Sequence, residues 1–441
     1  MASVVAGCQS TVDSLGYDDQ KGLVIHHLTP LTSYPNAFRD LLGKTNTEIS
    51  NKIADAFNQL FHGDASTQAI YFPVSGQDQA YIKDIYHGDI RTDGMGLGML
   101  IAVELGKQDE FDRLWNYARA NMQVQSGPNK GYFLSSCSTS VNPGVFCFDP
   151  YGPQQMLMAL LLANDLWGSP SADAGDGGVM LAAADAGTTT AVDYAGGARD
   201  LLTAMRHRVD QNGGVVGGVT DVFDPVTALV FDQPDVSHAD LTRPSIELPG
   251  FYELWAEATA DPFWNRAAAA ARDYWKRVVP SDLDTGLVPA GSHFDGSLVA
   301  GSDTFSTEAY RALINFVIDD IWAPVAPSGT DATAAMSATP AKPDRSWDVA
   351  EANLLLGFFI GAGINQYGRE FTLGGVTVDS ARENALVAAN GSLGLIATSG
   401  RSSDFVQAVW DLDTPTGNAR YFPGTMQLMA LLLLGGQFRV F

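Results

Sequence analysis

The chain alternates six times between two kinds of helical segment. One kind has apolar residues on one side and charged residues on the other, as expected for a helix that covers a core. The other kind is apolar nearly all round, as in the stretches MLMALLLA and MQLMALLLLGG, and predicts a buried helix. The amphipathic segments span 47–62, 109–123, 195–208, 262–278, 346–362 and 402–412, and the apolar segments span 93–105, 153–166, 248–260, 306–320, 382–397 and 424–435.

Six buried helices, each covered by an outer helix, describe two concentric rings. The sequence therefore predicts an all-α fold, an (α/α)6 barrel with six inner and six outer helices. We expect residues 1–34 to form an N-terminal extension and residues 35–441 to form a single catalytic domain. Ser169 to Thr190 and Pro324 to Asp344 are poor in residues to bury and predict surface excursions, because the alternation resumes beyond each.

Charge and hydropathy exclude several classes of partner. A formal net charge of −24 and a pI near 4.4 argue against nucleic acid and anionic membranes, since binding phosphates requires clustered Lys and Arg. Apolar runs such as Leu428 to Leu434 are far shorter than the roughly 20 residues needed to cross a bilayer. A neutral or cationic substrate fits this charge better.

The cysteines leave the compartment open. Cys137 and Cys147 flank a short loop, and two alternatives stand: a disulfide in an oxidising compartment, or two free thiols. Cys8 follows Val5, Ala6 and Gly7, a pattern similar to a lipoprotein cleavage site, but the apolar stretch before it is short. Secretion, a periplasmic location or a lipid anchor would follow if that motif is real, and a cytoplasmic location otherwise. The oligomeric state is open as well.

Polar residues gather just ahead of the predicted inner helices. In an (α/α)6 barrel these positions converge on one end. Opposed carboxylates, arginines and a tyrosine around an apolar-walled cleft suit sugar chemistry, in which one acid protonates the leaving oxygen and another carboxylate activates water. The residues are Asp89, Arg91, Asp93, Asp149, Tyr151, Arg243, Glu247, Thr307, Glu308, Arg382 and Glu383.

Asp93 has two interpretations. It stands at the start of an apolar helix, where an aspartate satisfies free N–H groups and complements the helix dipole. It is also placed to work as an acid at the mouth of the barrel. No cofactor or metal is expected, because the histidines lack ligand spacing and no HExxH, phosphate loop or GxSxG motif occurs. The glycines of GMGLGM follow no predicted strand and indicate close helix packing.

The run HGDIRTDGMGLGMLIAVEL, followed by DEFDRLWNYARANM, resembles the acid-bearing segment of glycoside hydrolase family 8, in its branch of reducing-end xylose-releasing exo-oligoxylanases. GKTNTEI, IYFPV, GYFLSSC, LPGFYELWAE, FSTEAYR and GGQFRVF occur in the expected order, so the resemblance covers nearly the whole chain. It implies an inverting glycosidase for β-1,4-linked oligosaccharides. It also implies that Asp93 is the general acid, in an apolar neighbourhood that favours its protonated form, and that Glu308 is the general base.

This chain departs from the family pattern in its carboxylates and its sugar contacts. The family has Glu where Asp93 stands and Asp where Glu308 stands, so the lengths of the two acids are exchanged. Ser135 replaces a tryptophan, Glu247 replaces a histidine, and Tyr151 with Asp149 replaces a third acid. We expect altered specificity, with a xylo-oligosaccharide-like substrate. The expected substrate-binding residues are Arg91, Asp149, Tyr151, Glu247, Tyr310 and Arg382.

Two alternatives remain. The first is a glycan-binding relative without catalytic activity. The second is an (α/α)6 glycosidase or lyase that acts on a different sugar, such as a furanoside or a uronate.

Overall fold

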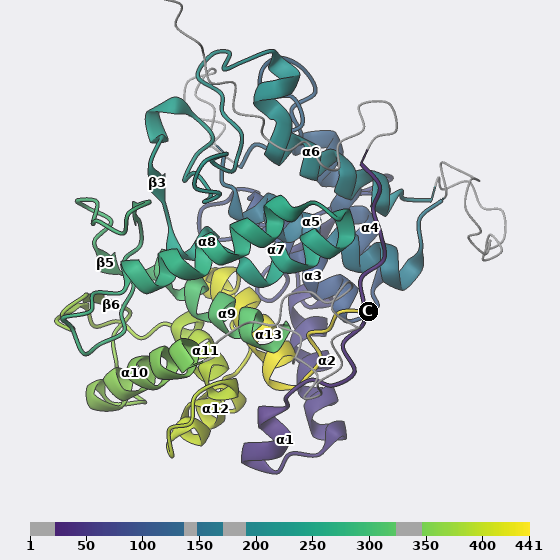
Figure 1. The fold of residues 1–441 in the computed structure, drawn as a ribbon. Helices are drawn as coiled ribbons and strands as arrows, with labels where there is room; N and C mark the ends of the chain where they lie inside the picture. The colour runs from purple at the N-terminus through teal and green to yellow at the C-terminus, as the bar shows by residue number, and fades with distance from the viewer. Residues whose placement is uncertain (1–22, 136–147, 171–190, 323–345) are drawn as a thin grey trace, which may run out of the picture.

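The computed structural model of the protein describes residues 23–135, 148–170, 191–322 and 346–441 (Figure 1). Twelve of the thirteen α-helices in this part of the chain form two rings around a continuous apolar core. Consecutive inner helices contact each other, and the last contacts the first, which closes the inner ring. The inner helices are α3 (Thr92–Glu104), α5 (Tyr151–Trp167), α7 (Pro249–Thr259), α9 (Thr307–Trp322), α11 (Asn384–Ser392) and α13 (Phe422–Leu434).

The outer helices cover the inner ring in the predicted order. Each of α2, α4, α6 and α8 contacts one inner helix, α12 contacts both α11 and α13, and α10 contacts η4 (Leu393–Leu395), the short turn that continues α11. The alternation predicted from the sequence, and with it the (α/α)6 barrel, is confirmed. The outer helices are α2 (Asn46–His62), α4 (Gln108–Tyr117), α6 (Tyr194–Asn212), α8 (Pro262–Val278), α10 (Ser346–Ala362) and α12 (Ser402–Trp410), and a short α1 (Ala37–Leu42) packs on α12.

Burial follows the apolar pattern of each helix. Every residue of α3 is buried, as its uniformly apolar sequence predicts. In α2 the buried residues recur at helical spacing along one face, and Thr45 caps its start. The Glu48 N–H donates to Thr45 Oγ1 at 3.2 Å, and the Thr45 N–H donates to Glu48 Oε2 at 2.8 Å, which is the predicted capping box.

Short antiparallel strands lie in the loops between the helices. β1 (Tyr71–Pro73) pairs with β2 (Ala80–Ile82) ahead of α3, and β3 (Leu241–Thr242) pairs with β4 (Ser292–His293). β5 (Thr304–Phe305) pairs with β6 (Glu370–Thr372), which pairs in turn with β7 (Thr377–Asp379). β5 ends directly before α9, so this small sheet fixes the entry of that helix.

Residues 23–34 contain no helix or strand and cross the ends of two inner helices. The His26 N–H donates to the Ala258 carbonyl at 2.7 Å, and the Leu28 N–H donates to Asp165 Oδ2 at 3.1 Å. The division of the chain at residue 34 stays a prediction. The three cysteines and nearly all of the two predicted surface excursions lie outside the described residues.

Among the residues that the structure describes, no helix has both the length and the apolar character needed to span a membrane.

Candidate active site

Asp93 lies in the first turn of α3 and is buried. Its Oδ2 accepts a hydrogen bond from Arg311 Nη2 at 2.7 Å, and its Oδ1 accepts from the Tyr421 hydroxyl at 2.8 Å and from the Gly94 N–H at 2.8 Å. The expected apolar neighbourhood is therefore wrong, because a buried guanidinium and a hydroxyl face this carboxylate. Arg91 is the N-cap residue of α3, and Asp93 accepts from one first-turn N–H, that of Gly94, so it serves the helix start as well as contacting Arg311 and Tyr421.

Glycines let the helices come close enough to build this site. A Cβ on Gly152 would lie 2.2 Å from the Thr92 carbonyl carbon, so α5 rests directly on the backbone of α3. A Cβ on Gly94 would lie 2.6 Å from the Tyr421 hydroxyl that binds Asp93. The predicted packing role of the glycines in GMGLGM is confirmed at Gly94 and Gly96, since a Cβ on Gly96 would lie 2.5 Å from the Gly152 carbonyl oxygen.

Glu308 lies in the first turn of α9, and 43% of its side chain is exposed. Its Oε2 accepts a hydrogen bond from Arg243 Nη1 at 3.1 Å and lies 3.5 Å from Arg311 Nη1. Arg311 stands one turn further along the same helix, so its guanidinium contacts both predicted catalytic carboxylates. The two acids differ in environment, because Asp93 is enclosed and Glu308 reaches solvent.

Arg243 contacts two further carboxylates besides that of Glu308. Its Nη2 donates to Asp149 Oδ1 at 3.0 Å, and its Nε lies 2.7 Å from Asp232 Oδ1. Burial alone would raise the pKa of Asp149, but the charges of Arg243 and Arg311 outweigh burial and hold that pKa below its usual value. Asp149 is therefore an anion at neutral pH, and a hydrogen-bond acceptor.

Tyr151 begins α5 and is brought into the same cluster. Its ring centroid lies 4.8 Å from the guanidinium carbon of Arg311, a cation–π distance, and Phe422 contacts the same guanidinium at 5.1 Å. Burial raises the pKa of Tyr151 despite the nearby positive charge of Arg311, so its hydroxyl remains protonated and can donate.

The four other predicted substrate-binding residues are not part of this cluster, although one of them lies beside it. Arg91 is next to the cluster, where its Nε contacts Asp89 Oδ1 at 3.0 Å and Asp84 Oδ2 at 3.3 Å. Arg382 is exposed, and its Nη1 donates to the Ile364 carbonyl at 3.2 Å.

Glu247 and Tyr310 are both fully buried. Glu247 Oε1 accepts from the Val230 N–H at 2.9 Å and from Thr242 Oγ1 at 3.1 Å, and the Tyr310 hydroxyl donates to the Arg369 carbonyl. The structure does not bring these two residues into the cluster.

No role was assigned to Arg311 or Tyr421 from the sequence, although the position of each residue in the sequence could have indicated one. Arg311 follows Glu308 by three residues, which places both on one face of a helix. Tyr421 directly precedes the last inner helix, the same position that singled out the other polar residues. Among the described residues, no three His, Cys, Asp or Glu side chains gather in a way that could hold a metal ion.

An acid and a second carboxylate at the convergent end of an (α/α)6 barrel define a carbohydrate-hydrolysing class of site. No protein-family model matches the chain. The chain is 30% identical over 422 residues to the reducing-end xylose-releasing exo-oligoxylanase Rex8A of Paenibacillus barcinonensis, covering 93% of this chain and 97% of that protein. A reducing-end xylose-releasing exo-oligoxylanase of Halalkalibacterium halodurans is 29% identical, covering 92% of this chain and 94% of its own length.

A solved structure shows similarity to the same kind of enzyme. The xylobiose complex of a family 8 glycoside hydrolase from Teredinibacter turnerae has a TM-score of 0.75 and 30% identity, covering 92% of this chain and 98% of that one. The chain belongs to glycoside hydrolase family 8. It is an inverting glycoside hydrolase, and the resemblance found in its sequence motifs is confirmed.

Proposed function

We propose that the enzyme hydrolyses a β-1,4-linked, xylo-oligosaccharide-like substrate with altered specificity. Asp93 acts as the general acid and Glu308 as the general base. The observation that carries the proposal is that one guanidinium, that of Arg311, contacts both carboxylates, at 2.7 and 3.5 Å. The catalytic residues of an inverting glycosidase are such a pair, placed on opposite sides of the bond to be cut.

The shared guanidinium of Arg311 keeps Asp93 and Glu308 close enough to act on one glycosidic bond. The exposure of Glu308 supports its role as the base, because water must reach it.

In the reaction, Asp93 donates its proton to the glycosidic oxygen as the bond to the anomeric carbon breaks. Glu308 takes a proton from water, whose oxygen bonds to the anomeric carbon from the opposite face. When Asp93 is protonated, one of its oxygens carries the proton for the sugar and the other continues to accept hydrogen bonds. Arg311 can shift toward Glu308, which it already contacts, and leave an Asp93 oxygen for the sugar.

The balance of charge in the cluster supports a neutral sugar. Asp93, Glu308, Asp149 and Asp232 face Arg243 and Arg311 through the contacts given above, so the two cations compensate half of the negative charge locally. An uncharged oligosaccharide then avoids the repulsion that a net charge of −24 gives any anion.

Altered specificity is supported by the sugar contacts that differ from the family. Glu247, which stands where the family has a histidine, is fully buried and hydrogen-bonded to Val230 and Thr242. Asp149, the replacement for the third family acid, is already bonded to Arg243. Its carboxylate therefore offers a sugar a different contact from that of a free acid.

The proposal is tested with a panel of xylo-, gluco-, chito-, arabino- and uronate-containing oligosaccharides. We expect new reducing ends from the xylo-oligosaccharides and none from the Asp93→Asn variant, which serves as the matched control. Sugar binding by calorimetry without any cleavage across the panel would instead identify a glycan-binding protein. An ultraviolet-absorbing unsaturated product would identify a lyase.

A further inference from the structure

A cleft lies in the outer wall of the barrel, beside α6. It has a volume of about 740 Å³ and is lined by α6, by the π-helix η1 (Ala118–Met122) and by the loop that follows η1. None of its lining residues belongs to the cluster around Asp93 and Glu308. A π-helical turn is a costly departure from regular helix and is frequent at functional sites.

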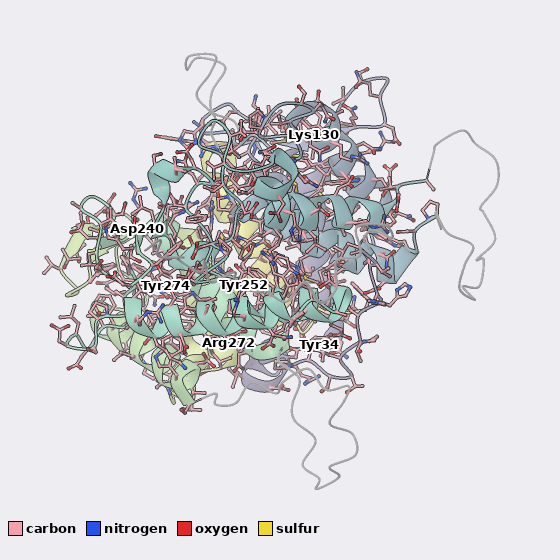
Figure 2. All side chains as sticks on the ribbon, turned by 45° about the horizontal axis from the view of Figure 1, so that its top comes forward. Tyr34, Lys130, Asp240, Tyr252, Arg272 and Tyr274 are labelled. Carbon is pink, nitrogen blue, oxygen red and sulfur yellow. The ribbon has the colours of Figure 1, made fainter. Side chains whose placement is uncertain are left out.

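The charge of this cleft is opposite to that of the whole protein. Arg119, Lys130, Arg199 and Arg208 line it, with Asp200 as the single carboxylate among the lining residues. The chain as a whole carries 50 acidic and 26 basic residues, so four cations around one cavity are a local exception. Figure 2 labels Lys130 near the upper edge of the molecule, away from the labelled Arg272 and Tyr274 on α8. A cationic cavity on an anionic protein concentrates anions where the rest of the surface repels them.

Arg208 is buried in the wall of the cleft with part of its donor capacity unused. The residue is 6% exposed, and its Nη1 donates to the Lys130 carbonyl. Its buried Nε has no hydrogen-bond partner among the described residues. A buried donor that lacks a partner destabilises the folded protein. The positive charge and the unused donor together point to an anionic acceptor.

The other polar residues that line the cleft can form hydrogen bonds with hydroxyl groups. Four of them are amides and one is an alcohol, and each carries an oxygen that can accept from a sugar hydroxyl. The volume matches pockets for small organic molecules and exceeds what a bare inorganic ion fills. No aromatic side chain is among the lining residues, which disfavours a base or ring that binds by stacking. The amide and alcohol residues are Gln123, Gln125, Gln211, Asn212 and Thr203.

We propose that this cleft is an accessory binding site for an acidic saccharide, in which a sugar carboxylate contacts the arginines and its hydroxyls contact the amides. Guanidinium groups bind carboxylates through paired, charge-assisted hydrogen bonds. The site goes beyond the hydrolytic reaction, because it shares no residue with the catalytic cluster. An acidic saccharide held here is bound to the enzyme without entering the active site.

The test is isothermal titration calorimetry with glucuronic acid, with glucose and inorganic phosphate as the other probes. We expect glucuronic acid to bind and glucose not to bind at this site. In the double variant Arg119→Glu/Lys130→Glu, the affinity for glucuronic acid is expected to fall at least ten-fold. Arg401→Glu is the matched control, because Arg401 is 55% exposed and Arg119 48%, and each pairs with one aspartate.

Two further measurements separate the site from folding and from catalysis. Arg208→Gln is expected to weaken glucuronic acid binding with little change in the melting temperature. The exposed double variant is expected to keep the wild-type turnover of the hydrolysed substrate, so a failure of the hydrolytic proposal leaves this test intact.

The proposal is overturned if the double variant binds glucuronic acid as well as wild type does. It is also overturned if glucose binds as tightly as glucuronic acid, or if inorganic phosphate binds more tightly than glucuronic acid, which would indicate a simple anion site.

Discussion

Arg311 Nη2 lies 2.7 Å from Asp93 Oδ2, and this ion pair joins α9 to α3 across the middle of the inner ring. The two helices are opposite each other in the order of ring contacts, so the pair spans the interior of the barrel. Burial would lower the pKa of Arg311, but the carboxylates of Glu308 and Asp93 outweigh it and raise that pKa, so the guanidinium stays charged. The reaction proposed above depends on this one cation.

Replacing either carboxylate by its amide tests the catalytic roles proposed for Asp93 and Glu308. Asp93→Asn and Glu308→Gln keep the size of each side chain but remove the proton that each group gives or takes. We expect turnover to fall by about 10² to 10⁴-fold in each variant. Release of reducing sugar measures turnover, and circular dichroism confirms that the fold is retained. Near-normal turnover in either variant would remove that residue from the mechanism.

Arg311→Lys tests the bridge between the two acids. Lysine keeps the positive charge, but its single ammonium cannot contact both carboxylates with a planar fork. We expect turnover to fall by roughly 10²-fold, the order of effect that follows when catalytic groups are displaced by about 1 Å.

The matched control for this variant is Arg272→Lys. Arg272, which Figure 2 labels, also forms a buried pair, with its Nη2 2.6 Å from Asp319 Oδ1. It lies on α8, and its ion-pair partners, Glu253 and Asp319, are not part of the cluster. Its replacement should lower the melting temperature and leave turnover unchanged. Equal losses of turnover in both variants would mean that Arg311 acts through stability alone.

Gly152→Ala tests whether close helix contact places Asp93. The new methyl group would meet the backbone of Thr92 at 2.2 Å and the Asp93 nitrogen at 2.6 Å, so the start of α3 must shift. We expect a loss of about 1 to 3 kcal/mol in the free energy of unfolding, as in other overpacked cores. A loss of turnover should accompany it.

Gly357→Ala is the control for this glycine substitution. Gly357 lies in α10, and a Cβ there meets nothing within 4 Å. Alanine should therefore raise the free energy of unfolding by about 0.5 to 1 kcal/mol, because it favours helix more than glycine does. Unchanged turnover in both glycine variants would contradict the packing argument.

Much of the fold could be predicted because it rests on local patterns. A largely apolar helix such as α3 is stable only in the protein interior. The capping box at Thr45 and Glu48 marks a helix start within four residues. In α10, amphipathicity is a weaker predictor of whether a helix lies in the inner or the outer ring. Its second half, LLLGFFIGA, is apolar all round, yet it lies in the outer ring, so its order in the alternation predicts its place better than its own pattern does.

The site was less predictable because its contacts join distant parts of the chain. Arg311 is 218 positions from Asp93, and Tyr421 is 328 positions from it. Position in the sequence suggested which residues reach the convergent end, but not which of them pair. Glu247 illustrates the difference, since it lies just before an inner helix but is buried outside the cluster, bonded to Val230 and Thr242.

Glu247 should give the protein a specific pH dependence of stability. Burial raises its pKa to about 8 from an ordinary value of 4.5, despite hydrogen bonds from Val230 and Thr242. The folded state then holds a proton that the unfolded state releases, so this contribution to stability is complete below pH 4.5 and is lost as the pH rises through about 8.

Glu247→Gln removes this dependence, because the amide resembles the protonated acid and has no proton to lose. Between pH 4.5 and 8, the free energy of unfolding of the wild type should fall relative to the variant by up to about 1.4 kcal/mol per pH unit. Urea unfolding at several pH values measures the difference. Parallel curves for the two proteins would mean that Glu247 is ionised in the folded state.

The most direct test of the mechanism is proton NMR of the anomer that the wild-type enzyme first releases from a β-1,4-linked xylo-oligosaccharide. Activation of water by Glu308 on the face opposite Asp93 predicts the α-anomer first, followed by slow mutarotation. A β-anomer as the first product would contradict the account, because it would require a covalent intermediate and a nucleophile in place of a base.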